Sequence, residues 1–281
     1  EREHTRSELG MLACLGVASE WAGWRCAFDA ASGSLQPVPE RYCSEDMIEW
    51  EMVPAGFEEL LTEDWADGRI HRRVVRLLPE DGCMVDNLNA EIEREILPLA
   101  RSGSLELCAD TAGSLSPAAW ALDEIFPSSG LWRCETIFSG LGGVPPRARR
   151  SDIESIAERT RVALTFDATQ GTVLGQVLVW RERSWSQPPL LEVREGGGRS
   201  GLDASWVSAR AGPCFASKGG VADGDALLLP AGVRVVTATP GELEVFLTIE
   251  GEGEGDGSAV IRVQRSWTDD EPLVLVERQA S

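Results

Sequence analysis

The chain has 281 residues, of which 43% are hydrophobic and 26% are charged. This composition excludes a mainly disordered chain, and the length suits two domains or one large β domain. The net charge is −20, from 46 acidic and 26 basic residues, whereas a nucleic-acid-binding protein needs positive charge to release counterions from phosphates. We therefore expect no direct binding to DNA, RNA or anionic lipid. No stretch approaches 18 consecutive apolar residues, so no transmembrane segment is expected, and membrane association would need a protein partner.

The distribution of cysteine and histidine disfavours metal binding and nucleophilic catalysis. The seven cysteines have wide, irregular spacing without a CxxC motif, so neither a structural zinc site nor a dithiol redox site is predicted. The two histidines are His4 and His71, too few for a multi-histidine metal site. His71 lies beside two arginines, and we interpret it as a solvated strand residue rather than a catalytic base. No metal site and no catalytic residue are predicted.

The first part of the chain predicts strands and one short helical turn. Strands are expected at residues 21–29, 56–64 and 69–78, and the turn at residues 44–50. The third of these strands alternates apolar and basic residues on one face, which predicts partial burial. That face comprises Ile70, Arg72, Val74 and Arg76.

Further along the chain, two helices are expected between strands. Residues 89–97 predict a short helix or an acidic bulge, and residues 116–126 predict a helix that is entered at Pro117. A strand follows at residues 131–138. The Gly- and Pro-rich stretch at residues 139–150 predicts a linker.

The remaining sequence predicts an antiparallel meander, because short apolar runs alternate with turn residues. Alternate strand positions share a face, so one set of apolar residues is expected to fill the interior of this half. The set is Val162, Leu164, Phe166, Leu178, Trp180, Val233, Val235, Val245, Leu247, Ile261 and Val263. We therefore expect a packed C-terminal half, with any small-molecule cavity in the first half or between the halves.

Tryptophan and arginine side chains in the expected strands are the candidates for a ligand site. A tryptophan ring can line a ligand cavity or plug a barrel. An inward-pointing arginine must bind a ligand or form a structural pair with a carboxylate, because an unpaired buried charge is very costly. The candidate ligand-binding residues are Trp24, Trp132, Arg133, Arg181, Glu182 and Arg265. Consecutive strand residues face opposite sides, so at most one of Arg181 and Glu182 faces a cavity.

The acidic segment at residues 45–65 is the candidate surface for a protein partner. It presents large apolar side chains among carboxylates, either as a docking surface or as an ordinary lid over the first half. The candidate partner-binding residues are Met47, Trp50, Met52, Phe57 and Trp65.

Three motifs resemble those of the calycin superfamily, whose lipocalin-type barrels enclose small apolar ligands. The matching residues are Trp21, Gly23 and Trp24 near the start, then Arg161, Val162, Leu164 and Phe166, then Trp180, Arg181 and Glu182. More narrowly, the chain resembles uncharacterised calycin-like proteins of plastids and cyanobacteria that carry two such barrels. The predicted fold is mainly β, with two calycin-like antiparallel β-barrels, at residues 1–148 and 149–281, and a few short helices.

The resemblance implies a non-enzymatic binding or assembly factor, or a peripheral subunit, of a pigment-bearing photosynthetic complex. The implied location is the chloroplast, in solution or at the thylakoid, and the implied ligand is a pigment or another apolar small molecule. One alternative is a lipocalin-fold enzyme, a chromophore lyase or isomerase acting on a tetrapyrrole or carotenoid, in which Arg181 and Glu182 hold propionates or move a proton. Another is a purely structural interaction protein that acts through its acidic segment.

Overall fold

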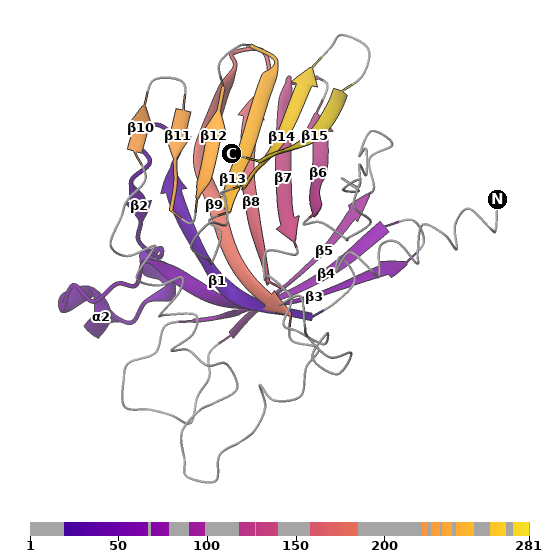
Figure 1. The fold of residues 1–281 in the computed structure, drawn as a ribbon. Helices are drawn as coiled ribbons and strands as arrows, with labels where there is room; N and C mark the ends of the chain where they lie inside the picture. Colours follow the sequence, from indigo (N-terminus) through magenta and orange to yellow (C-terminus); the bar gives the residue numbers. More distant parts are fainter. Residues whose placement is uncertain are drawn as a thin grey trace.

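A computed structural model describes most of the strands expected from the sequence. The described residues are 20–66, 69–78, 90–98, 118–126, 128–139, 158–184, 221–223, 226–230, 232–237, 240–249, 259–267 and 272–280. Within them the protein is mainly β, as predicted, and forms two antiparallel sheets (Figure 1).

The larger sheet has nine strands. In spatial order these are β5 (Ala90–Pro98), β4 (Arg69–Leu77), β3 (Gly56–Ala66), β1 (Glu20–Asp29), β9 (Thr172–Ser184), β8 (Glu158–Asp167), β7 (Leu131–Ser139) and β6 (Ala118–Phe126), while β2 (Leu35–Gln36) also pairs with β1. The smaller sheet is a six-stranded meander. Its strands are β10 (Val221–Asp223), β11 (Ala226–Leu228), β12 (Val233–Val236), β13 (Glu242–Ile249), β14 (Ala259–Trp267) and β15 (Pro272–Ala280).

The described residues also contain two short helices between β2 and β3, namely η1 (Glu40–Tyr42) and α2 (Glu45–Glu49). The α2 helix confirms the predicted turn at residues 44–50. Ser44 caps it by accepting a hydrogen bond from the backbone N–H of Met47, which satisfies one of the free donors at the helix start. No helix in the described part of the chain is long and apolar enough to cross a membrane.

The six-stranded sheet packs against one face of β1, β9, β8, β7 and β6 (Figure 1). The core between the sheets contains nine of the eleven apolar residues expected to fill the C-terminal half. The exceptions are Leu178 and Trp180, which lie on the opposite face of β9. Val179 is directly opposite Val162 in the register, so Val177 and Val179 occupy the core in their place.

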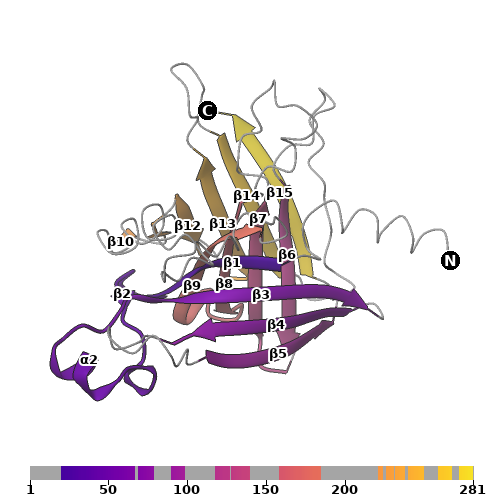
Figure 2. The same ribbon diagram turned by 90° about the horizontal axis from the view of Figure 1, so that it is seen from below.

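The nine-stranded sheet curls into a half-barrel. In a flat sheet, five strand spacings would separate β4 from β7, or about 24 Å. Arg72 on β4 nevertheless donates a 2.6 Å hydrogen bond to Glu135 on β7. The strands β3, β4 and β5 must therefore fold back over the face of β8 and β7 that points away from the six-stranded sheet, and Figure 2 shows them crossing there.

The short helix or acidic bulge predicted at residues 89–97 is wrong, because these residues form the regular strand β5. The helix predicted at residues 116–126 is also wrong, because these residues form β6. In β5, Glu91, Glu93 and Glu95 alternate with other residues and pair with the arginines of β4. In β6, Ala119 and Ala121 pack into the core between the sheets. Tertiary contacts thus override the helical propensity of alanine, glutamate and leucine.

A curled antiparallel half-barrel is consistent with a calycin-like barrel fold, but the arrangement of two barrels is not confirmed. The expected boundary at residue 148 and the predicted linker, apart from Ser139 at the end of β7, fall within residues 140–157, outside the described part of the chain. Strands from both sides of that boundary share the larger sheet, where β7 pairs with β8 and β1 pairs with β9.

Candidate functional site

A row of alternating charges crosses six strands on the inward face of the half-barrel. The residues that oppose one another, from β5 to β8, are Glu91, Arg76, Glu59, Gly23, Glu182 and Arg159. Arg76 donates to Glu91 at 2.5 Å and to Glu59 at 2.8 Å. Arg159 donates to Glu182 at 2.6 Å. Directly opposed charges of opposite sign stabilise a sheet, so this row favours one register.

Gly23 interrupts the charge row between Glu59 and Glu182. A Cβ atom at this position would lie 2.2 Å from the carbonyl oxygen of Arg181 and 2.8 Å from Cγ of Glu182. Glycine inside a strand often marks such a close approach or a barrel corner. The absence of a side chain at Gly23 therefore leaves room for Glu182 in the interior.

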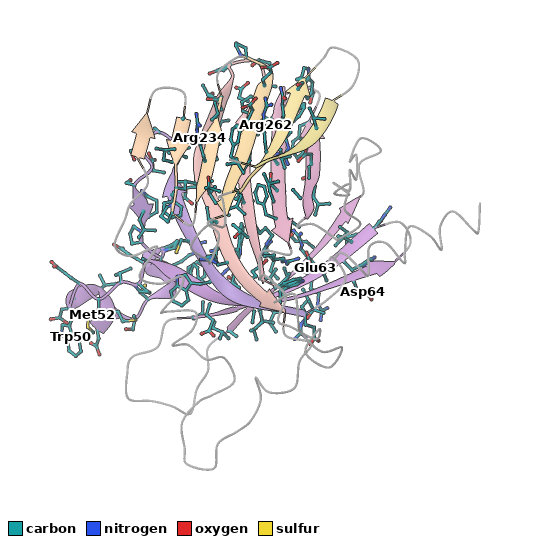
Figure 3. All side chains as sticks on the ribbon, viewed as in Figure 1. Trp50, Met52, Glu63, Asp64, Arg234 and Arg262 are labelled. Carbon is teal, nitrogen blue, oxygen red and sulfur yellow. The ribbon has the colours of Figure 1, made fainter. Side chains whose placement is uncertain are left out.

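A second group of ion pairs joins the two halves of the curled sheet. Glu63 on β3 accepts hydrogen bonds from Arg72 and from Arg159, each at 2.7 Å. Arg72 also binds both carboxylate oxygens of Glu135, at 2.6 and 2.7 Å. A bidentate pair of this kind fixes direction as well as distance. Figure 3 labels Glu63 beside Asp64 on β3; the first is buried in this network and the second is exposed.

Two tryptophans complete the network. The Arg159 guanidinium lies 4.1 Å from the centre of the Trp21 ring, and that of Arg161 lies 3.9 Å from the Trp180 ring. Nη2 of Arg159 and Nε of Arg161 are buried without hydrogen-bond partners among the described residues. The ring faces compensate for this in part, because a cation is attracted to the negative face of an aromatic ring.

Neighbouring arginines lower the pKa of two carboxylates of this network, Glu135 and Glu182. Burial alone would raise the pKa of Glu135, but Arg72 and Arg161 outweigh it and lower the pKa to about 2. Burial is likewise outweighed at Glu182, where Arg159 and Arg161 lower the pKa. A carboxylate with a lowered pKa stays charged at neutral pH and is a weak base.

The network leaves a cavity of about 380 Å³ at the open side of the half-barrel. Its lining includes the apolar side chains of Ala163, Leu178 and Trp180. The side lined by the end strands, which we call its mouth, has Glu93 and Glu95 of β5 and Leu122, Asp123 and Glu124 of β6. We call this open side between β5 and β6 the seam.

The tryptophan candidates for ligand binding lie away from this cavity. Trp132 is buried in the core between the sheets and packs against Trp267, with ring centres 4.6 Å apart. Trp24 packs against the same core and is partly buried. Both therefore act as core residues in this structure, which is the alternative that the sequence left open.

The charged candidates are also dispersed. Arg133 lines the cavity mouth and pairs with Glu124 at 3.2 Å. Glu182 faces the interior and Arg181 the opposite side, so only one of the two faces inward, as expected for consecutive strand residues. Arg265 is fully buried between the sheets, where it donates to Asp123, Thr136 and the backbone carbonyl of Glu135. It joins β14 to β6 and β7 as a structural cation.

The interior arginines and glutamates of β3, β4, β7 and β8 were not among the predicted site residues. Their signal in the sequence was the alternation of charged and apolar residues in two neighbouring strands. Phe57, Glu59, Leu61 and Glu63 share one face of β3, as Ile70, Arg72, Val74 and Arg76 share one face of β4. Opposite signs at matched positions of adjacent strands indicate mutual pairing.

Residues 45–52, which we call the α2 segment, hold three of the apolar candidates for partner binding. Trp50 and Met52 are 63% and 54% exposed, and Figure 3 shows them at the outlying end of the molecule, away from both sheets. Met47 is half-buried. Phe57, in contrast, is buried between the guanidinium groups of Arg25 and Arg76. The side chain of Trp65 lies outside the described part of the structure.

Comparisons with known proteins give no family for this chain. No model of a protein family matches the sequence, and no curated protein matches it either. Among the described residues, no group of three or more His, Cys, Asp or Glu side chains is arranged to hold a metal ion.

Proposed function

We propose that this protein is a non-enzymatic binding factor that recognises a basic partner protein through the α2 segment. The observation that carries the proposal is the exposure of Trp50 and Met52 at the outlying end of the molecule. Large exposed apolar side chains close together on a surface are characteristic of protein interaction sites. The cavity in the half-barrel is lined mainly by paired charged side chains, which disfavours the burial of a large apolar ligand there.

The acidic side chains of the α2 segment indicate that its partner is basic. Glu45, Asp46, Glu49 and Glu51 lie among the exposed apolar residues of the α2 segment, and all four carboxylates are exposed. A partner segment that combines lysine or arginine with an apolar side chain complements both features. Electrostatic complementarity of this kind increases the association rate and excludes acidic partners.

The resemblance to calycin-like proteins of plastids extends the proposal to a cellular location and a partner complex. The extended proposal is that the protein is located in the chloroplast and that its partner belongs to a pigment-bearing photosynthetic complex. A blue-native gel of the source membranes tests this extension. Migration with a larger complex supports it, and a protein that always migrates alone and binds no pigment refutes it.

The alternative of a chromophore lyase or isomerase requires a group that can move a proton. Glu182, the inward-facing candidate, binds Arg159 at 2.6 Å and Arg161 at 2.9 Å. These two cations lower its pKa, although burial acts in the opposite direction. Such a carboxylate is unsuited to proton transfer at neutral pH, and the geometry favours binding over catalysis.

A crosslinking experiment with the full chain tests the docking surface. A photo-reactive amino acid replaces Trp50, and the crosslinked partner peptide is identified by mass spectrometry. We expect a peptide rich in lysine or arginine, and we expect the double variant Trp50→Ala, Met52→Ala to lower complex formation at least tenfold, since two central apolar contacts are lost. The matched control is Leu228→Ala, which truncates an exposed apolar residue on the smaller sheet. An acidic partner peptide, or an equal loss in the control, overturns the proposal.

A further inference from the structure

The two end strands of the curled sheet, β5 and β6, both line the cavity at the seam. Neither has a second neighbouring strand among the described residues. A β-strand with one free side presents backbone N–H and C=O groups that can pair with another chain. The seam is therefore a place where the half-barrel can accept a further strand.

β5 has two chemically distinct faces. Its inward face carries Glu91, Glu93 and Glu95, whose side chains are 44%, 51% and 40% exposed. Its outward face carries Ile92 and Ile96, which are 55% and 57% exposed, with the exposed Arg94 between them. Charged residues that point inward commonly protect a sheet edge from pairing. Two highly exposed isoleucines on the same strand have no such protective value.

The inner arginines leave these carboxylates incompletely neutralised. Glu93 lies 3.5 Å from Arg76, and Glu95 lies 3.8 Å from Arg72, at the outer limit of an ion pair. Both arginines have closer partners, Glu59 and Glu135 respectively. Burial raises the pKa of Glu95, despite the nearby charge of Arg72. An additional cation at the seam would have favourable contacts with both Glu93 and Glu95.

We propose that β5 pairs with an extended segment of a partner protein in which basic and aliphatic residues alternate. The segment adds one strand to the half-barrel, with its lysine or arginine side chains over Glu93 and Glu95 at the cavity mouth. Its aliphatic side chains lie beside Ile92 and Ile96 on the outer face. Backbone hydrogen bonds supply affinity in this mode of recognition, and the alternate side chains supply specificity.

The same charges disfavour a second copy of this chain as the occupant. Antiparallel pairing of β5 with itself about a two-fold axis opposes residues that point to the same face. In every register centred between residues 91 and 95, inward carboxylates lie opposite inward carboxylates, and like charges in that position are destabilising. The proposal involves residues different from those of the α2 segment, so each of the two can fail without the other.

Peptide binding to the full-length protein tests the proposal. The probe is a capped peptide of alternating lysine and valine with nine residues, as many as β5 contains. Its control is the same peptide N-methylated at the amides that face β5, which keeps the charges and removes the backbone donors. We expect the unmethylated peptide to bind at least tenfold more tightly, since methylation prevents strand pairing, and to slow hydrogen exchange in β5.

Variants of the protein separate strand pairing from general charge attraction. We expect Glu93→Gln with Glu95→Gln to weaken binding by up to about tenfold, as for two exposed ion pairs. Ile92→Thr with Ile96→Thr should weaken it as well. The matched control Glu20→Gln with Glu242→Gln removes equal charge from exposed positions on β1 and β13, outside both β5 and the α2 segment, and should leave binding unchanged. Equal binding of both peptides, equal loss in the control, or unchanged exchange in β5 at saturating peptide overturns the proposal.

Discussion

Trp180 donates its indole N–H to Oε2 of Glu59 at 2.7 Å, although 121 residues separate the two in the sequence. Trp180 is on β9 and Glu59 on β3, with β1 between them. The other oxygen of Glu59 accepts from Arg76 and lies 3.3 Å from Arg25. One buried carboxylate on β3 thus joins its own strand to β1, β4 and β9.

Removal of Trp180 should destabilise the protein strongly. We expect Trp180→Ala to lower the free energy of unfolding by about 3–5 kcal/mol, because a buried aromatic ring is lost. Trp180→Phe keeps most of the ring and should cost about 1–3 kcal/mol, since Glu59 loses a donor. Urea unfolding followed by circular dichroism measures both. Partner binding through the α2 segment should persist in the folded variants; a stable Trp180→Ala protein would contradict this account.

The stability of the half-barrel should fall in acid. The pKa of Glu135 in the folded protein is about 2, below its ordinary value of 4.5. A carboxylate with a depressed pKa contributes its stability above the ordinary value and loses it as the pH falls through the folded value. We therefore expect the urea midpoint to decrease from about pH 4.5 to pH 2. Glu135→Gln should flatten this decrease and the exposed control Glu49→Gln should not; identical profiles for all three proteins would disprove the assignment.

A methyl group at Gly23 should disturb the centre of the charge row. Gly23→Ala forces Glu182 and the backbone of β9 to move. We expect it to lower the free energy of unfolding by about 1–3 kcal/mol or more, as at other overpacked sites. Gly175→Ala is the matched control, because its Cβ would meet no atom within 4 Å and only its positive φ of 68° is unfavourable. That control should cost about 1–2 kcal/mol. Thermal unfolding should rank the variants in this order, and the reverse order would argue against a close approach at Gly23.

The pair formed by Arg265 and Asp123 should show strong coupling. Asp123→Ala leaves the fully buried guanidinium without its anion, and such a loss typically costs about 3–5 kcal/mol. Arg265→Met combined with Asp123→Leu removes both charges and should recover most of that stability. A double-mutant cycle measured by denaturant unfolding gives the coupling energy. If the changes in the free energy of unfolding caused by the two single substitutions simply add, Arg265 and Asp123 are not energetically coupled.

The strands of this fold follow from local sequence patterns, whereas their partners do not. The period of two in residues 69–78 predicts the strand and its partial burial correctly, and the structure shows that the face with Ile70 and Arg72 is the buried one. The same period is present in Glu91, Glu93 and Glu95, but glutamate and leucine favour helices in isolation, and the strand emerges only through pairing with β4. The face of Leu178 and Trp180 could not be deduced either, because it depends on the register that places Val179 opposite Val162.

The candidate site, like the fold, could be predicted from the sequence only in part. The sequence indicates that inward arginines need carboxylate partners, and the structure supplies such a partner for each of Arg72, Arg76, Arg159 and Arg161. The sequence gives no indication that Arg72 on β4 contacts Glu135 on β7, because that contact arises from the curl of the whole sheet. The exposure of Trp50 follows from the acidic residues around it, which cannot enter an apolar core without partners.

The pairing of β1 with β9 has a consequence for biosynthesis. During translation β1 leaves the ribosome long before Ser184 is made, and at common elongation rates the interval is roughly 8–30 s. Throughout that interval one side of β1 lacks its final neighbour, and the glutamates of β3 lack Arg159. An unpaired strand edge of this kind is prone to association with other chains. Newly made molecules should therefore depend on chaperones until β9 emerges and the half-barrel can form.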